Sequence, residues 1–212
     1  MGATLSQLIP IQELTPGQIG AIRNGAINYV VALAARELAM SEDKLVVRDI
    51  RPKDDLALYG ASGTDAAAAF NSWYFDCSAE TVGSYKALGS ATGTMGDQRY
   101  VAIFGVRDQR LNSCENSAGA DVSASIAGLP PADAARVSLI RLTVGGAYKV
   151  IWDTRCMQAY TDALVAFSPS PVIIPQNSSF LIEYQFDISK ESTVRLQLIG
   201  VVVEPRGKVI SP

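Results

Sequence analysis

The side chains that most often carry out chemistry in proteins are scarce in this chain of 212 residues. It contains no histidine, so it lacks the commonest general base and the commonest metal ligand, and histidine-dependent catalytic triads are excluded. The cysteines Cys77, Cys114 and Cys156 lie far apart, and their spacing predicts neither a disulfide framework nor a zinc site. An enzyme that works with carboxylates alone is a further hypothesis, and it would need two acidic groups in one cleft.

Carboxylates occur as two adjacent pairs and as scattered loop residues. Glu42-Asp43 and Asp54-Asp55 are neighbours in sequence on expected turns, a pattern typical of solvated charge rather than of an acid and base couple. A calcium site would need four expected loop aspartates to converge, and these lack the regular spacing of a dedicated calcium loop: Asp97, Asp108, Asp121 and Asp133. We therefore expect no enzymatic activity, no cofactor and no metal.

Aromatic residues offer a different kind of site. Tryptophan and tyrosine rings can form a face that binds sugars, although most aromatic residues in strands pack in the core. The candidates for such a face are Trp73, Tyr74, Tyr85, Tyr100, Trp152 and Tyr160. A carbohydrate-binding β-sandwich module therefore remains an alternative function.

Charge and hydrophobicity restrict the partners. The net charge is −3 and is spread evenly, so no basic face for direct nucleic-acid binding is expected. A membrane-spanning helix needs about 20 residues. The uncharged run at residues 24–35 is shorter than that, so no membrane span is expected. The first six residues match the pattern for myristoylation, which leaves lipidation of Gly2 open.

The clearest structural element lies in the last third of the chain, where apolar residues stand at every second position. This is the period of a half-buried strand. One run is followed by a polar break and a second run, so we predict an antiparallel pair of strands. Prolines before the first run and after the second should mark where pairing stops. The first run holds Phe180, Ile182, Tyr184, Phe186 and Ile188, the second Val194, Leu196 and Leu198, and the prolines are Pro169, Pro171, Pro175 and Pro205.

Further strands are predicted upstream, with Gly145-Gly146 as a hairpin turn between two of them. They cover residues 44–50, 70–77, 99–106, 136–144 and 147–152, whereas residues 154–167 are compatible with a short helix or a crossover. Seven or eight strands without alternating helices indicate a mainly β fold. We expect an antiparallel β-sandwich or jelly-roll domain over residues 44–212.

Residues 1–43 are expected to form an N-terminal arm and one long helix. The arm, residues 1–14, is extended and apolar enough to contact a partner, through Leu5, Leu8, Ile9, Ile11 and Leu14. The helix should begin after Thr15, which forms a capping box with Gln18, and run to about Met40. Its wide apolar stripe includes Tyr29. Gly20 and Gly25 inside the helix indicate close approach of a neighbouring backbone.

The C-terminal run, Pro171-Val172-Ile173-Ile174-Pro175-Gln176-Asn177-Ser178 followed by the two predicted strands, resembles the final strands of bacteriophage virion proteins of the β-sandwich and jelly-roll type. The resemblance implies a non-enzymatic capsid, cement or connector component located in the virion. Such a protein would form homo-oligomers and contact other virion proteins through its arm, its helix and the long loop expected at residues 107–131.

Overall fold

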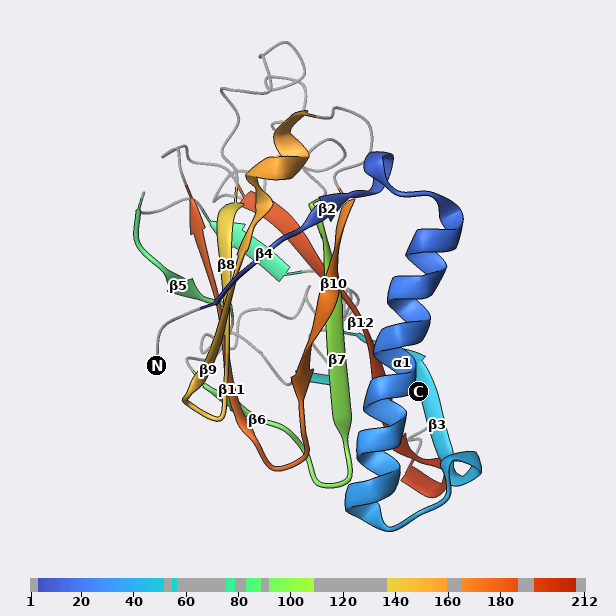
Figure 1. Cartoon of the computed structure of the whole chain (residues 1–212). Coiled ribbons are helices and arrows are strands. Elements are labelled where there is room, and N and C mark those ends of the chain that lie inside the picture. Colours follow the sequence, from blue (N-terminus) through green and yellow to red (C-terminus); the bar gives the residue numbers. More distant parts are fainter. Residues whose placement is uncertain are drawn as a thin grey trace.

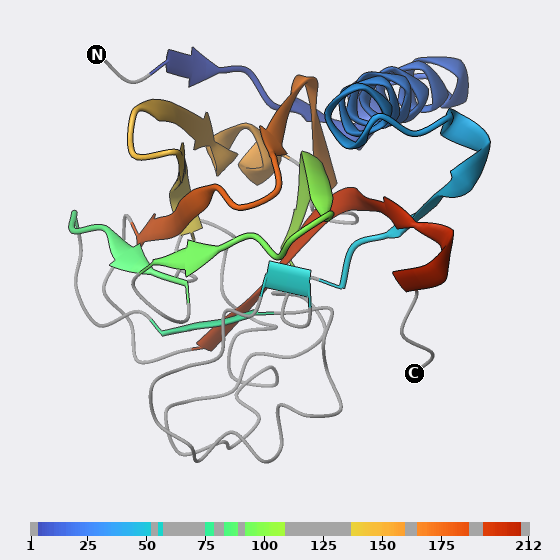
Figure 2. The same ribbon diagram turned by 90° about the horizontal axis from the view of Figure 1, so that it is seen from below.

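The computed structural model describes residues 4–51, 55–56, 75–78, 83–88, 92–108, 137–159, 165–186 and 193–208. This part of the chain is mainly β, with two antiparallel sheets and one long helix. A mainly β fold with one long N-terminal helix is what the sequence patterns predict. Figure 1 shows the two sheets side by side with the helix along the outer side of the second, and Figure 2 shows the same layers from below. The residues outside these ranges include most of the predicted long loop and residues 209–212 at the C-terminus.

The first sheet has the strand order β1-β9-β8-β11-β5, and β6 also pairs with β11. Its pairs are antiparallel apart from β1 with β9, which is parallel. The strands are β1 (Thr4–Ser6), β5 (Lys86–Ala87), β6 (Gly93–Thr94), β8 (Val137–Val144), β9 (Tyr148–Asp153) and β11 (Ser179–Phe186).

The second sheet has the order β2-β10-β7-β12-β3, and β4 also pairs with β12. All of its pairs are antiparallel. The strands are β2 (Ile9–Pro10), β3 (Leu45–Asp49), β4 (Phe75–Ser78), β7 (Tyr100–Asp108), β10 (Val165–Ile174) and β12 (Thr193–Pro205). The strands predicted around β3, β7, β8 and β9 are confirmed, and so is the turn at Gly145 and Gly146, which have φ values of 60° and 71°.

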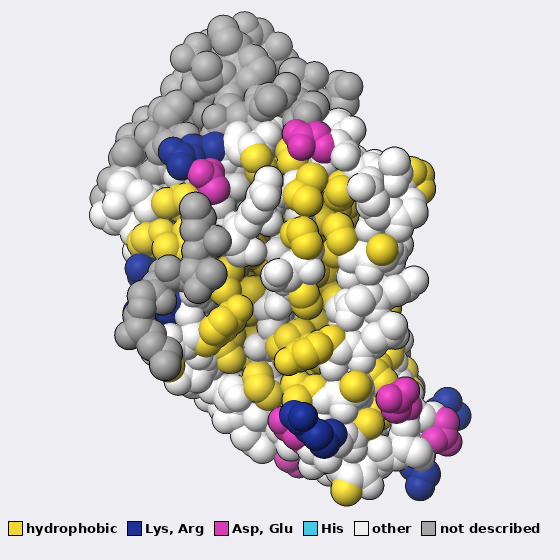
Figure 3. Space-filling view, viewed as in Figure 1, with side chains coloured by type: hydrophobic (Ala, Val, Ile, Leu, Met, Phe, Trp, Pro, Cys, Tyr) yellow, Lys and Arg dark blue, Asp and Glu magenta, His cyan; other side chains and the backbone are white. Residues whose placement is uncertain are grey.

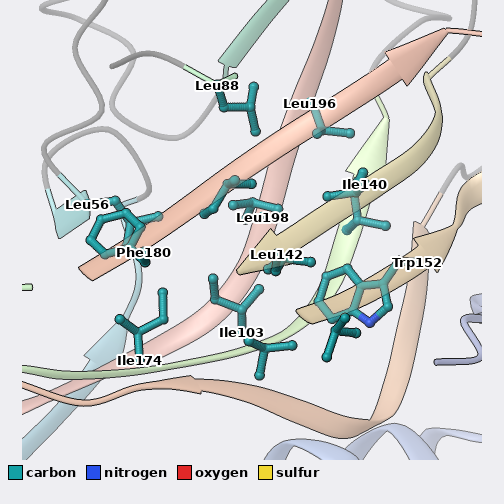
Figure 4. Close-up of a cluster of buried hydrophobic side chains, with 14 of the residues drawn as sticks. Leu56, Leu88, Ile103, Ile140, Leu142, Trp152, Ile174, Phe180, Leu196 and Leu198 are labelled. Carbon is teal, nitrogen blue, oxygen red and sulfur yellow. The ribbon is translucent and has the colours of Figure 1, made fainter. Parts of the chain in front are cut away.

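The main core lies between the sheets. Alternate residues of each strand point inward, so side chains from both sheets form one buried cluster. Phe180, Ile182 and Tyr184 of β11 all belong to it, which confirms the inward face predicted for that strand. Figure 4 shows part of this cluster, with Ile140, Leu142, Trp152 and Phe180 from the first sheet and Ile103, Ile174, Leu196 and Leu198 from the second.

The prediction that the two C-terminal runs pair with each other is wrong. β11 pairs with β8, β5 and β6, whereas β12 pairs with β7, β3 and β4, so the two strands belong to different sheets. Both runs alternate because each has one face on the shared core, and the alternation specifies that face without specifying the hydrogen-bonded neighbour. The strand pairing that the sequence suggested in the C-terminal run is therefore absent.

The expectation that Pro169 and Pro171 lie outside any ladder also needs correction, because both lie within β10. The pairing of β10 with β7 shifts register between Phe167 and Val172, and the prolines fall inside that irregular stretch. The ladder with β7 is interrupted in that stretch, so the missing N–H groups of the prolines are tolerated. Residues 154–167, left open between helix and crossover, contain the 3₁₀ helix η5 (Thr154–Ala159) and the start of β10.

The arm contacts both sheets of its own chain. β1 pairs with β9 and β2 pairs with β10, so residues 4–10 pass from one sheet to the other. Leu8, between the two strands, is only 3% exposed and belongs to the main core. A 3₁₀ turn, η1 (Ile11–Glu13), then leads to the helix. The arm therefore closes one edge of each sheet.

The helix α1 (Pro16–Leu38) begins and ends as its sequence predicts. The Thr15 hydroxyl accepts a hydrogen bond from the backbone N–H of Gln18 at 3.3 Å, and the Gln18 side chain accepts one from the backbone N–H of Thr15 at 2.8 Å. Ala26, Val30 and Ala34 are buried against the outer face of the second sheet. The small alanine side chains let the helix lie close to that sheet.

Candidate functional site

The most deeply buried charges form an arginine cluster, defined as Arg48, Arg99, Asp55 and Glu204. Arg48 donates two hydrogen bonds to Asp55, at 2.7 and 2.6 Å, and one to Glu204 at 3.1 Å. Arg99 donates to the other oxygen of Glu204 at 3.2 Å. The hydrogen bonds that Arg48 donates to Asp55 raise the pKa of Arg48 above its usual value. Each carboxylate is thus held between guanidinium groups. The cluster therefore connects chain segments, and neither Asp55 nor Glu204 is free to act as a base.

The expectation of solvated charge at Asp54-Asp55 is wrong for Asp55, which is 6% exposed, while Asp54 lies outside the described residues. The Asp55 carboxylate also accepts a hydrogen bond from the backbone N–H of Arg51 at 2.7 Å. Burial is tolerated because ion pairs and hydrogen bonds compensate for the lost hydration. The other pair, Glu42 and Asp43, is exposed as expected.

A second ion pair lies on the outer face of the first sheet. Arg141 donates to both oxygens of Glu183, at 2.5 and 2.7 Å, and its guanidinium carbon lies 3.9 Å from the centroid of the Tyr85 ring. This cross-strand pair explains why Glu183, on the polar side of β11, is nearly buried. It also leaves one face of Tyr85 covered by a cation.

Of the aromatic residues proposed for a sugar-binding face, the three that the structure describes do not form one. Tyr100 and Trp152 are fully buried, so neither ring can stack on a sugar. The Tyr100 hydroxyl donates to Glu37 of α1 at 2.9 Å, and burial together with this carboxylate raises the pKa of Tyr100. The other candidates, Trp73, Tyr74 and Tyr160, lie outside the described residues.

Metal ligands do not converge in the described part of the chain, where no group of three histidine, cysteine, aspartate or glutamate side chains could hold an ion. Asp97 is exposed, the side chain of Asp108 is not described, and Asp121 and Asp133 lie outside the described residues. Cys156 is half-buried beside the core, and burial raises the pKa of its thiol to about 11. Within the described ranges, no helix has both the length and the hydrophobicity to span a membrane.

Among the described residues, two open grooves lie along the outer face of the second sheet. A single helix is about 10 Å wide, whereas the five strands that lie across this six-stranded sheet, about 4.8 Å apart, span roughly twice that width. The helix therefore leaves a groove on each side. We call them the tyrosine groove, on the side of β10, and the Arg107 groove, on the side of β3 and β12.

The tyrosine groove has a volume of about 550 Å³, and none of the described residues that line it is charged. It is lined by Gly25, Tyr29, Tyr148, Pro169, Ser170, Pro171 and Ile173. Tyr29 and Tyr148 are 60% and 52% exposed, respectively, the two most exposed large apolar side chains described. Figure 3 shows hydrophobic side chains gathered across the middle of the side of the molecule seen in Figure 1, with the charged ones mainly nearer its ends. Uncharged grooves with exposed aromatic rings are typical of surfaces that bind a partner.

The predicted contact residues are distributed unevenly around this groove. Gly25 lines it, whereas Gly20 does not. A Cβ atom added at either glycine would meet nothing within 4 Å, so no other part of the described chain approaches them closely. Leu8 is buried in the core, Ile9, Ile11 and Leu14 are half-buried, and the side chain of Leu5 is not described.

The sequence analysis missed both groove tyrosines. Tyr29 was assigned to the buried stripe of the helix because Ala26 and Leu33 lie three and four residues away, yet it points to solvent beyond the edge of β10. Tyr148 lies two residues after Gly146 at the start of β9, and an apolar residue next to a projecting turn is the one signal that could have indicated its exposure. The prolines reached the groove only because β10 is irregular there.

We compared the chain with protein-family models, curated proteins and solved structures. None of the three comparisons found a match. The functional argument therefore rests on the residues and surfaces described above.

Proposed function

We propose that this chain is a non-enzymatic structural subunit of a virus particle, a capsid, cement or connector component with a β-sandwich of the jelly-roll type. The observation that carries the proposal is the tyrosine groove, an uncharged surface with two exposed tyrosines beside a glycine of the helix. Two sheets packed face to face, with the helix on the outside, provide a rigid body that can present such a surface to copies of itself.

The arrangement of charges supports a structural role. The buried carboxylates of Asp55, Glu183 and Glu204 are each held by arginine side chains. A general base must be able to accept a proton from a substrate, and these groups are already neutralised by fixed cations. These ion pairs connect separate segments of the chain, as expected of a subunit with a structural role.

Contact between copies is proposed to use the outer side of α1 together with the tyrosine groove. Gly25 leaves the helix backbone accessible, and Tyr29 and Tyr148 offer large rings that lose little conformational entropy when they are buried. The half-buried Ile9, Ile11 and Leu14 extend the apolar surface from the arm. The long loop at residues 107–131 remains a proposed contact, since residues 109–131 of it lie outside the described residues.

Size-exclusion chromatography with light scattering tests this proposal. We expect the wild-type chain to form oligomers as its concentration rises, and the double variant Tyr29→Ala/Tyr148→Ala to remain smaller at the same concentration. Val47→Ala is the matched control, because Val47 is also an exposed apolar residue but lies on β3, away from the groove. A wild-type chain that stays monomeric at high concentration without any partner would refute the proposal.

A second candidate function, a carbohydrate-binding module, is favoured by the same pair of exposed tyrosines. Tyrosine rings in an open groove can stack on the apolar faces of sugar rings. Glycan binding that disappears in Tyr29→Ala or Tyr148→Ala, while the wild-type chain remains monomeric, would favour this alternative. Glycan binding that survives in the double variant would exclude the groove as the sugar site.

A further inference from the structure

The Arg107 groove lies on the opposite side of α1 from the tyrosine groove and differs from it in chemistry. Its volume is about 410 Å³, and it runs between the N-terminal half of the helix and strands β10, β7, β12 and β3. Figure 2 shows the helix lying over only part of this sheet. The groove is lined by Ile19, Arg23, Asp49, Ile50, Phe104, Arg107, Val165, Phe167, Gln197, Leu198, Ile199 and Gly200.

The floor of the groove is apolar because of the register of three adjacent strands. Phe167 of β10 and Ile199 of β12 are both the partners of Gly105 in β7, so they face each other across a residue without a side chain. A Cβ atom at Gly105 would lie 3.0 Å from the Phe167 ring and 3.4 Å from Ile199, which shows how closely these side chains approach one another. Phe104 and Ile19 complete this apolar surface.

The next row on the outer face of the same three strands contains two polar residues, Arg107 and Gln197. Arg107 is the ladder partner of both Val165 and Gln197, so these residues lie side by side at the end of the apolar floor. Arg107 is exposed and forms no ion pair or hydrogen bond within the described part of the chain. The other charges in the groove, Arg23 and Asp49, pair with each other at 3.2 Å. Among the described residues, Arg107 is therefore the one charge of this groove without a partner.

We propose that this groove binds a medium-chain fatty acid. The carboxylate would accept hydrogen bonds from the Arg107 guanidinium, whose fork matches a carboxylate, and from the side-chain amide of Gln197. The acyl chain would lie on Phe167, Ile199 and Phe104 along the flank of the helix. The volume falls within the range of about 300–1,000 Å³ that small-molecule sites occupy. The unpaired charge next to an apolar floor selects an anionic amphiphile over an uncharged one.

Isothermal titration of the full-length chain with decanoate and with decanol, both below their aggregation limits, tests the proposal. We expect decanoate to bind and decanol to bind more weakly. Arg107→Gln should weaken decanoate binding roughly tenfold to a hundredfold, the effect of losing a charged hydrogen-bonding partner, and leave decanol binding unchanged. Arg36→Gln is the matched control, since Arg36 is exposed near the end of α1 and away from the groove.

Two further variants locate the site. Val165→Trp should fill the groove and abolish decanoate binding, and circular dichroism would confirm that it folds. Tyr29→Ala/Tyr148→Ala should bind decanoate as the wild type does, which separates this inference from the proposed assembly surface. The inference is overturned if decanoate does not bind, if Arg107→Gln binds it as tightly as the wild type, or if Val165→Trp still binds it. It is also overturned if Arg107→Gln changes the oligomeric state without any decanoate binding, since a second copy would then occupy the groove.

Discussion

The two faces of the second sheet are covered in different ways. Its inner face, with Val101, Ile103 and Val106 of β7, packs against a whole sheet and is fully buried. Its outer face, with Tyr100, Ala102 and Phe104 of the same strand, is covered by one helix. A sheet covers a sheet completely, whereas a helix covers a central stripe and leaves its flanks open. Both grooves lie on those flanks, so the outer face combines stability with the capacity to bind.

The strongest test of this comparison uses neighbouring residues of β12 that point to opposite faces. Leu198→Ala removes a fully buried inner side chain and should lower the free energy of unfolding by about 2–5 kcal/mol. Ile199→Ala, on the half-buried outer face, should lower it by only about 1 kcal/mol, because solvent can enter the space that the substitution leaves. Chemical denaturation of both variants measures the difference. Equal losses would show that the two faces are equally well packed.

A smaller loss of stability is expected from a substitution in the arginine cluster. Glu204→Gln leaves Arg48 and Arg99 without one of their counter-charges in a buried setting and should lower the free energy of unfolding by about 2–3 kcal/mol. Asp49→Asn, which breaks the exposed pair with Arg23, should change it by less than about 1 kcal/mol. Thermal unfolding at neutral pH compares the two variants. A neutral Glu204→Gln would mean that the arginine cluster does not stabilise the fold.

On the outer side of the helix, a substitution should be favourable. Gly25→Ala adds a methyl group that meets nothing within 4 Å, and the higher helix propensity of alanine should raise the free energy of unfolding by about 0.5–1 kcal/mol. If copies approach this surface closely, the same change should weaken assembly in light-scattering measurements. Gly20→Ala is the matched control, because Gly20 has the same free space but does not line the tyrosine groove. Greater stability without any loss of assembly would exclude close contact at Gly25.

The smallest expected effect is on the reactivity of the Cys156 thiol, which lies beside the core. Because burial raises the pKa of this thiol to about 11, its alkylation should accelerate only as the pH approaches that value, as mass spectrometry of the Cys156 peptide would show. The unfolded thiol ionises at lower pH, near its ordinary value. The contribution of this group to stability is therefore complete below that value and is lost as the pH rises toward 11. Alkylation with a midpoint near the value for an exposed thiol would show that Cys156 is accessible.

Local patterns were sufficient for much of the fold. The Thr15 and Gln18 capping box set the start of α1, and the glycines at 145 and 146 set the hairpin, because both depend on residues close in sequence. Strand identity followed from alternation at Phe180, Ile182 and Tyr184. The hydrogen-bonded partner of each strand did not follow from alternation, because alternation specifies which side chains of a strand are buried and not which strand lies next to it.

The amino-acid sequence by itself indicated the strands β3, β7, β8, β9, β11 and β12, the start of the helix, and the absence of histidine chemistry in this chain, whereas it did not indicate β10. Only the tertiary structure decided that β11 and β12 join different sheets, that Asp55 is buried between arginines, and that Tyr29 points to solvent. Helix caps and strand periodicity arise from residues a few positions apart, which the chain sequence lists directly. Grooves and ion pairs arise where distant segments meet, as Tyr29 and Tyr148 do, and only packing brings such residues together.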